Sequence, residues 1–353
     1  MKKQVRIYAS LILLILIASS CRKTAFQVVY PSLNDGRYDS EFPYRNSSEE
    51  LDYIFKSVKK LYCLVEYDRY HFNFEQQITL QGLKDIKLRR AAINKGFFSE
   101  SVHGSATIVK NENNRVVVLT CAHIIDYPDT IYSYFIDNQN NETTILESVS
   151  VKRKQNNFIR ELPDSGNLEI IFADDELDVA FLGNSFDDIS SSNPPVFSYP
   201  VGEPMDLEWG SFVYIMGFPA GHQMVTRGIV SNPKVNKKGE FLIDALFNQG
   251  ISGGIVLAVR DGVPNFELIG IAKSVSANYK NVLKPAHESH QEMYNPNIPY
   301  EDEMYVKVEK EINYGVTFTI SIGEIRNLYY LNRDEFVVRG ANLDRFFSNY
   351  GKK

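Results

Sequence analysis

The chain has 353 residues, of which 44% are hydrophobic and 23% are charged. That length is enough for one large all-β domain or two small ones. The formal net charge is -6, with both signs dispersed along the chain, which argues against nucleic acid as the main partner. The 21 Tyr and 22 Phe are typical of half-buried strands.

The N-terminus reads as a targeting segment. A basic start is followed by an apolar run, residues 11–17, that is too short to cross a bilayer. Small residues then precede Cys21, the first cysteine of the chain. This pattern resembles a bacterial lipoprotein signal, with residues 1–20 removed and Cys21 lipidated. It predicts a protein of the bacterial cell envelope that contacts the membrane through Cys21; the alternative is an ordinary secretory signal.

Residues 21–47 are polar and without periodicity, and we interpret them as a tether. Cys63 and Cys121, the remaining cysteines, do not have the spacing of a zinc site. They could pair in an oxidising compartment, but two separate buried thiols are the favoured interpretation.

The rest of the chain alternates short apolar runs with turn signals, which is typical of an all-β domain over residues 48–331. A helix is predicted over residues 48–60 and a terminal helix over 322–331, with a tail at 332–353. The basic run Lys84–Arg90 is interpreted as a solvated helix face. Strands are predicted over residues 61–67, 104–109, 115–120, 179–182, 214–217, 226–231, 241–245, 255–259, 266–271 and 314–320, and Asn113-Asn114 predicts a turn before strand 115–120.

A serine stands between glycines in the stretch Gly250-Ile251-Ser252-Gly253-Gly254. Two glycines after a serine let other backbone approach it closely. The N–H groups of Gly250 and Ser252 could then form a two-donor pocket for an oxyanion. A serine hydroxyl is a weak nucleophile without an adjacent base, so this chemistry also needs a histidine and an acid.

His123 ends the predicted strand 115–120 and is the candidate base. Four acids lie beside the later strand 179–182, where a charged turn or an incidental cation site is the plainer interpretation. Of these acids, Asp178 directly precedes the strand and can be held rigidly. We therefore expect Asp178, rather than Asp174 or Asp175, to orient His123.

Together these motifs resemble the chymotrypsin-like serine proteases, which share the order His, Asp, Ser. Within that group the chain looks most like the Deg/HtrA-type trypsin-like peptidases of bacteria, over about residues 61–322 and without a PDZ domain. Further matching stretches are Thr120-Cys121-Ala122-His123, Met216-Gly217-Phe218-Pro219-Ala220-Gly221, Thr226-Arg227-Gly228-Ile229-Val230-Ser231 and Tyr314-Gly315-Val316-Thr317-Phe318. The resemblance implies a double β-barrel with short N- and C-terminal helices.

The same resemblance implies a serine endopeptidase of protein or peptide substrates, with His123, Asp178 and Ser252 as catalytic residues and no metal or cofactor. The base of its S1 pocket would be Leu246, and Ile271, Ala272 and Lys273 would form the pocket wall. Leu246 offers no carboxylate for a basic side chain, so we expect a small or medium apolar P1 residue. The chain departs from the family at Cys121, Ile251 and Ile255, where a small residue, Asp or Asn, and Pro are usual.

Two other functions fit parts of the sequence. Gly250–Gly254 also satisfies the G-x-S-x-G elbow of α/β-hydrolases, with Asp261 and then His287 or His290 as partners. That elbow must open a helix, whereas residues 255–259 have the pattern of a strand. A trypsin-like fold kept as a non-catalytic binding module is the second alternative.

Overall fold

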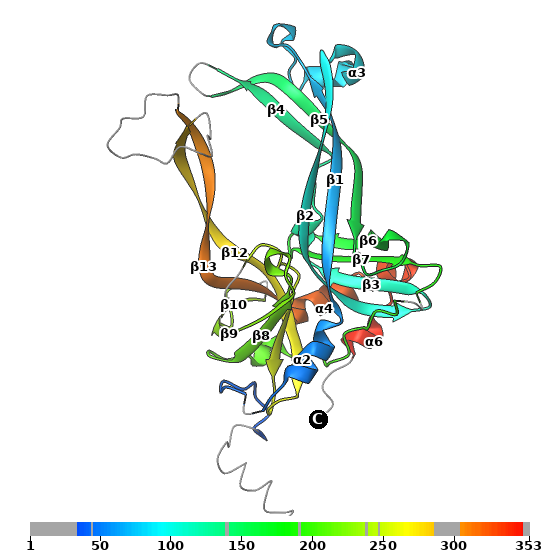
Figure 1. The fold of residues 1–353 in the computed structure, drawn as a ribbon, viewed down its shortest axis with the longest axis vertical. Helices are drawn as coiled ribbons and strands as arrows, with labels where there is room; N and C mark the ends of the chain where they lie inside the picture. The colour runs from blue at the N-terminus through cyan, green and yellow to red at the C-terminus, as the bar shows by residue number, and fades with distance from the viewer. Residues whose placement is uncertain are drawn as a thin grey trace, which may run out of the picture.

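The structure is a computed structural model that describes residues 34–43, 45–137, 141–189, 192–236, 239–245, 248–285 and 304–348. It contains two closed six-stranded β-barrels side by side, from which two long arms rise (Figure 1). The expected all-β double barrel with short terminal helices, the trypsin-like fold, is confirmed. Among the described residues, no helix has the length and apolar character needed to cross a membrane.

The first barrel has the strand order β1-β2-β3-β7-β6-β5 and closes where β1 pairs with β5; β4 lies outside it on β5. Its strands are β1 (Val58–His71), β2 (Asn94–Glu112), β3 (Arg115–Thr120), β4 (Thr130–Ile136), β5 (Glu142–Phe158), β6 (Asn167–Asp174) and β7 (Val179–Ser185). The predicted turn between β2 and β3 is present. Asn113 and Asn114 both have positive φ, 54° and 61°, which asparagine tolerates better than most residues.

The second barrel has the order β10-β13-β12-β11-β8-β9. Its strands are β8 (Phe212–Gly217), β9 (Met224–Asn232), β10 (Glu240–Asp244), β11 (Ile255–Val259), β12 (Phe266–Pro285) and β13 (Met304–Ser321). All residues of β8 and β11 are buried. Alternate side chains of these strands fill the barrel interior and the core shared with the first barrel, because successive strand residues point to opposite faces.

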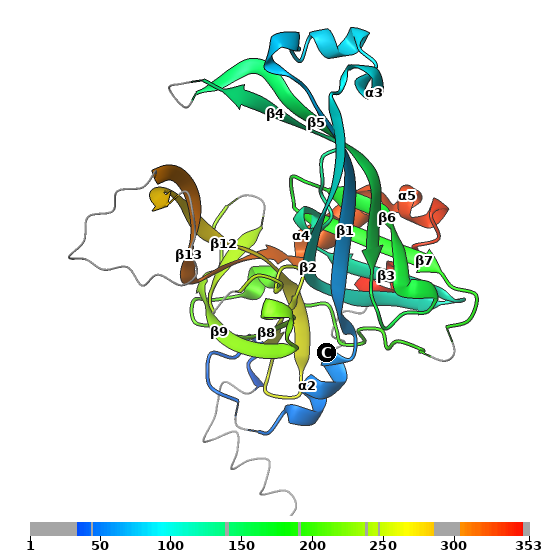
Figure 2. The same ribbon diagram turned by 45° about the horizontal axis from the view of Figure 1, so that its top comes forward.

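Both arms are strand extensions that continue beyond the barrels (Figure 2). One is built from β1, β2, β4 and β5, and a small core of Tyr70, Phe72, Ile78, Leu146 and Val149 stabilises its upper end. Three short helices lie near that end: η2 (Phe74–Gln76), η3 (Gly82–Asp85) and α3 (Leu88–Ala91). The other arm is the hairpin of β12 and β13, whose pairing runs from Gly270 and Ser321 out to Pro285 and Met304.

Aromatic residues fasten the C-terminal helices to the first barrel. These helices are α4 (Ile322–Leu331), α5 (Arg333–Val338) and α6 (Asp344–Phe347). Phe336 of α5 is fully buried, with its ring edge-on to Phe181 of β7 at 5.0 Å and to Tyr329 at 5.1 Å. The segment predicted as a tail therefore contributes to the hydrophobic core.

The N-terminal helix α2 (Ser48–Phe55) follows a segment that contacts the second barrel, residues 35–39, within the predicted tether. The Tyr38 hydroxyl donates to Glu267 at 2.7 Å, and the Arg260 guanidinium lies 4.0 Å from the centroid of the Tyr38 ring. Arg260 also donates to the carbonyl of Gly36 at 2.6 Å and pairs with Glu267 at 3.2 Å. We call Gly36, Tyr38, Arg260 and Glu267 the N-terminal clasp. Signal residues 1–20 and Cys21 lie outside the described residues.

Candidate active site

His123 and Asp178 meet at the rim of the first barrel. His123 lies in a single 3-10 turn, η4 (Ala122–Ile124), directly after β3, and Asp178 directly precedes β7. The Nδ1 atom of His123 lies 2.8 Å and 3.0 Å from the two Asp178 carboxylate oxygens. The backbone N–H of His123 also donates to Asp178 at 2.9 Å. One carboxylate therefore fixes both the ring and the backbone of the histidine.

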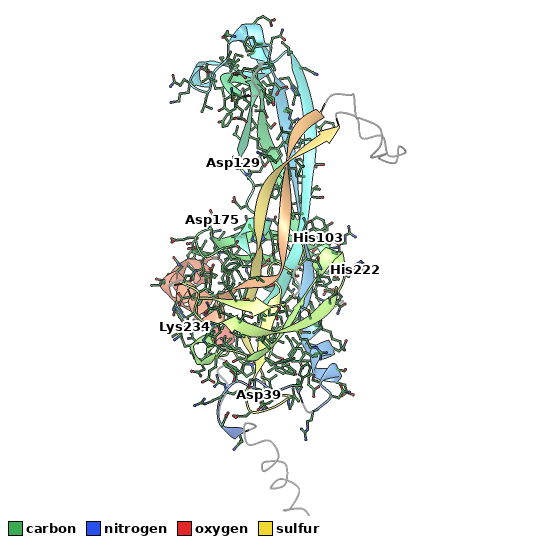
Figure 3. All side chains as sticks on the ribbon, turned by 90° about the vertical axis from the view of Figure 1, so that its left-hand side faces the viewer. Asp39, His103, Asp129, Asp175, His222 and Lys234 are labelled. Carbon is green, nitrogen blue, oxygen red and sulfur yellow. The ribbon has the colours of Figure 1, made fainter. Side chains whose placement is uncertain are left out.

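Asp178 is buried and has a positive φ of 64°, an uncommon conformation that short polar residues tolerate best. Its two neighbours in sequence have other roles. Asp174 accepts a hydrogen bond from the N–H of Leu177 at 2.7 Å and so caps the turn between β6 and β7. Asp175 is exposed on the surface (Figure 3). Among these acids, Asp178 is the partner of His123.

Ser252 comes from the second barrel, in the loop between β10 and β11. The glycines on either side are required by space and by backbone conformation. A Cβ on Gly250 (φ 101°) would lie 2.4 Å from the carbonyl oxygen of Phe218, and one on Gly253 (φ 79°) would lie 2.1 Å from that of Ser105. The unusual Ile251 is 2% exposed, and it packs in the core of the second barrel. The buried Ile251 side chain therefore anchors this turn in the core of the second barrel.

Two amide groups of the serine loop are candidates for binding an oxyanion. The N–H of Ile251 donates to Asn248 and that of Gly254 donates to Ile251, so the turn has its own hydrogen bonds. Among the residues that the structure describes, the N–H groups of Gly250 and Ser252 donate to no backbone carbonyl. These are the two donors that the sequence predicts for an oxyanion.

Ser105 of β2 ties the serine loop to the first barrel, a role that sequence reasoning missed. Its N–H donates to the carbonyl of Ser252 at 2.8 Å. Its buried hydroxyl donates to the carbonyl of Gly250 at 2.8 Å and accepts from the N–H of Phe218 at 2.9 Å. The glycine-serine pair at 104–105 was the available signal, but nothing in it indicates a contact with residue 252.

The Ser252 hydroxyl donates to the backbone carbonyl of Lys273 on β12, at 2.9 Å. Within the described part of the chain, it makes no hydrogen bond to His123. The Lys273 side chain forms an ion pair with the buried Glu240 of β10, at 2.9 Å. The positive charge of Lys273 is therefore balanced by Glu240.

The residues expected to form a substrate pocket are only partly described. Ile271 and Ala272 are fully buried in β12, and Ala272 exchanges backbone hydrogen bonds with Gly253 and Gly254. Leu246, the predicted pocket base, lies outside the described residues.

A second histidine adjoins the serine loop. A Cβ on Gly250 would lie 2.7 Å from Nε2 of His103, a residue of β2. That nitrogen is buried and has no hydrogen-bond partner among the described residues. Burial and the nearby Lys60 ammonium lower the pKa of His103, so its ring is neutral at pH 7. Figure 3 shows His103 near His222, which follows the Pro219–Gly221 turn.

The α/β-hydrolase alternative is wrong, because Ile255–Val259 is a β-strand and Ser252 does not open a helix. Its two candidate histidines, His287 and His290, lie outside the described residues.

The family model of the trypsin-like peptidase domain matches residues 104–271, which include His123, Asp178 and Ser252. No curated protein matches the chain significantly. A crystal structure of the serine endoprotease from Yersinia pestis matches with a TM-score of 0.38 and 17% sequence identity, covering 85% of this chain and 69% of that chain.

Proposed function

We propose that the chain, with its match to the trypsin-like peptidase domain over residues 104–271, is a serine endopeptidase. One observation carries the proposal: a histidine bound to a buried carboxylate lies on one barrel, and a serine loop with two amide donors that reach no backbone carbonyl among the described residues lies on the other. Neither group can catalyse peptide hydrolysis alone. Together they supply the base, the nucleophile and the oxyanion site. Proteins or peptides are the substrate class.

In the proposed mechanism, His123 accepts the Ser252 hydroxyl proton as the oxygen attacks a peptide carbonyl. The N–H groups of Gly250 and Ser252 stabilise the negative charge of the tetrahedral oxygen. His123 then protonates the leaving amine, and water hydrolyses the acyl-enzyme by the same steps in reverse. Asp178 keeps the proton of neutral His123 on Nδ1 and stabilises the cationic ring. Before attack, the hydroxyl must turn away from the Lys273 carbonyl.

Two finer features belong to the proposal. A small or medium apolar P1 residue is preferred, because Leu246, the residue that the sequence predicts for the pocket base, lacks a carboxylate. The enzyme works in the bacterial cell envelope, held to a membrane by lipid on Cys21.

A non-catalytic binding module is the second candidate, since the Ser252 hydroxyl donates its hydrogen bond to the backbone carbonyl of Lys273 rather than to His123. A biotinylated fluorophosphonate probe separates the two. If the chain is an enzyme, mass spectrometry should find one probe adduct per chain, on Ser252, and no adduct on the Ser252→Ala variant. A natively folded chain that forms no adduct and cleaves no protein substrate would establish the binding module instead.

A further inference from the structure

Cys121 brings a third metal-binding side chain to the histidine and carboxylate of the site. It directly follows β3, is fully buried, and its thiol donates to the carbonyl of Ala272 at 3.4 Å. One ligand atom each from Cys121, His123 and Asp178 lie within 4.8 Å of one another. The spacing of cysteines along the sequence does not reveal this cluster, because Asp178 comes from a distant turn.

We propose that Cys121, His123 and Asp178 form an inhibitory binding site for a divalent cation of the zinc class. Sulfur, imidazole nitrogen and carboxylate oxygen are the three donor types that zinc accepts in proteins. The harder cations Mg²⁺ and Ca²⁺ prefer sites built from oxygen alone, so this donor set selects against them. Only the inhibitory effect rests on the proposed function; binding does not.

The dimensions fit a zinc ion. With bonds of about 2.0–2.3 Å, donors around one tetrahedral ion lie about 3.5 Å apart. The Nδ1 atom of His123 and the nearer Asp178 oxygen are 2.8 Å apart, and the whole cluster stays within 4.8 Å. The Nδ1 atom and the Asp178 oxygen would have to separate by about 0.7 Å, and the sulfur would have to come closer, to complete the ligand set. His123 gives access, since 45% of its side chain is exposed.

Charge also balances. Binding requires the Cys121 thiol to release its proton to solvent, which leaves a thiolate. The thiolate and the Asp178 carboxylate carry two negative charges that offset the two positive charges of the ion. A buried charge is tolerated when it is compensated in this way. Without metal the thiol stays protonated, because burial and the Asp178 charge raise the pKa of Cys121 well above its usual value.

Inhibition follows from the histidine tautomer. Metal bound at Nδ1 of His123 displaces the proton from that nitrogen, and the neutral ring then carries its proton on Nε2. An Nε2–H group cannot accept the proton of Ser252. The metal-bound form therefore lacks its general base, while the metal-free form keeps it.

Cobalt(II) is the probe for binding, because a thiolate–cobalt bond gives a near-ultraviolet charge-transfer absorption whether or not the chain is a peptidase. All proteins carry Cys21→Ser, which leaves Cys63 and Cys121 as the thiols. Cys63 is the matched control for Cys121. Both cysteines are free and buried, but Cys63 belongs to no metal-binding cluster among the described residues. We expect saturable absorption in the parent and in Cys63→Ala, and none in Cys121→Ala or in the size-matched Cys121→Ser.

Zinc inhibition is measured on the same variants with a protein substrate. Zinc should inhibit the parent reversibly, with activity restored by EDTA, and Cys121→Ala should need at least about tenfold more zinc for the same fractional loss of its own metal-free activity. Thermal unfolding checks that each variant is folded. Cobalt absorption that survives both Cys121 substitutions, or equal zinc inhibition of parent and Cys121→Ala, would overturn the proposal. Absent peptidase activity with normal cobalt absorption would reject the proposed function and keep the metal site.

Discussion

Asp178 holds His123 at three points: the carboxylate contacts Nδ1 with both oxygens, at 2.8 and 3.0 Å, and accepts the backbone N–H at 2.9 Å. An amide in place of the carboxylate can present an N–H to Nδ1, which would favour the wrong tautomer. We therefore expect Asp178→Asn to lower kcat by about four orders of magnitude. The exposed Asp175→Asn is the control. Both variants are compared by steady-state hydrolysis of one protein substrate. A greater loss of kcat in Asp175→Asn would show that Asp175, and not Asp178, is the acid that orients His123.

Removing the Ser105 hydroxyl should impair catalysis without touching a reacting group. The hydroxyl bridges Gly250 and Phe218, so Ser105→Ala leaves a carbonyl and an N–H without their partner. Lost positioning of the Gly250 donor should lower kcat up to about 100-fold, with little change in KM. Unfolding should become easier by about 1–3 kcal/mol. Ser231→Ala, at an exposed serine of β9, is the control.

Specificity can be profiled with a peptide library. Cleavage should follow Val, Ala or Leu, with modest discrimination among them, since one methylene is worth only about 1–3 kcal/mol. Because Glu240 balances the charge of Lys273, the expected P1 preference depends on Leu246. Dominant cleavage after Arg, Lys, Asp or Glu would show that Leu246 is not at the pocket base.

The C-terminal helix α5 offers a test of stability. Phe336 is fully buried, whereas Val338 in the same helix is 87% exposed. Phe336→Ala should lower the free energy of unfolding by about 3–5 kcal/mol, through lost contacts and the cavity left behind. Val338→Ala should change it by less than about 0.5 kcal/mol. Denaturant titrations measure both, and equal effects would show that α5 does not support the core.

The sequence predicts the elements whose signals are local. The turn at Asn113-Asn114, the strand after Asp178 and the helix after Ser321 are all found where their short-range patterns place them. It does not predict the length of β12 and β13 beyond the barrel, because residues 272–285 become a strand by pairing with residues some 20 to 50 positions later in the chain. The role of Phe336 was missed for a similar reason: its partner Phe181 is distant in sequence.

The same limit divides the candidate site. Ser252, His123 and Asp178 stand in recognisable motifs, and His123 and Asp178 are in direct contact. Ser105, His103 and the approach of Cys121 to Asp178 depend on how strands from different parts of the chain meet. Such contacts follow from barrel closure, which no single motif specifies.

Lipid on Cys21 is tested by fractionation. We expect the parent in the membrane fraction and Cys21→Ser in the soluble fraction, with mass spectrometry of the N-terminal peptide identifying the lipid. Membrane association that persists in Cys21→Ser, with no lipid on that peptide, would favour a plain secretory signal.

If the chain is anchored by lipid on Cys21 as proposed, the N-terminal clasp would limit how far the barrels can lie from the membrane. Because the carbonyl of Gly36 accepts a hydrogen bond from Arg260, the tether is fixed to the second barrel at Gly36, before helix α2 begins. The segment from Cys21 to Gly36 spans at most about 50 Å when fully extended. Full release of this segment would also break the backbone hydrogen bonds of Asp39 with Val259 and Phe212, and it would lengthen the tether by roughly ten residues. If Cys21 carries lipid as proposed, the clasp would limit the substrates of the proposed peptidase to those that come within this distance of the membrane surface.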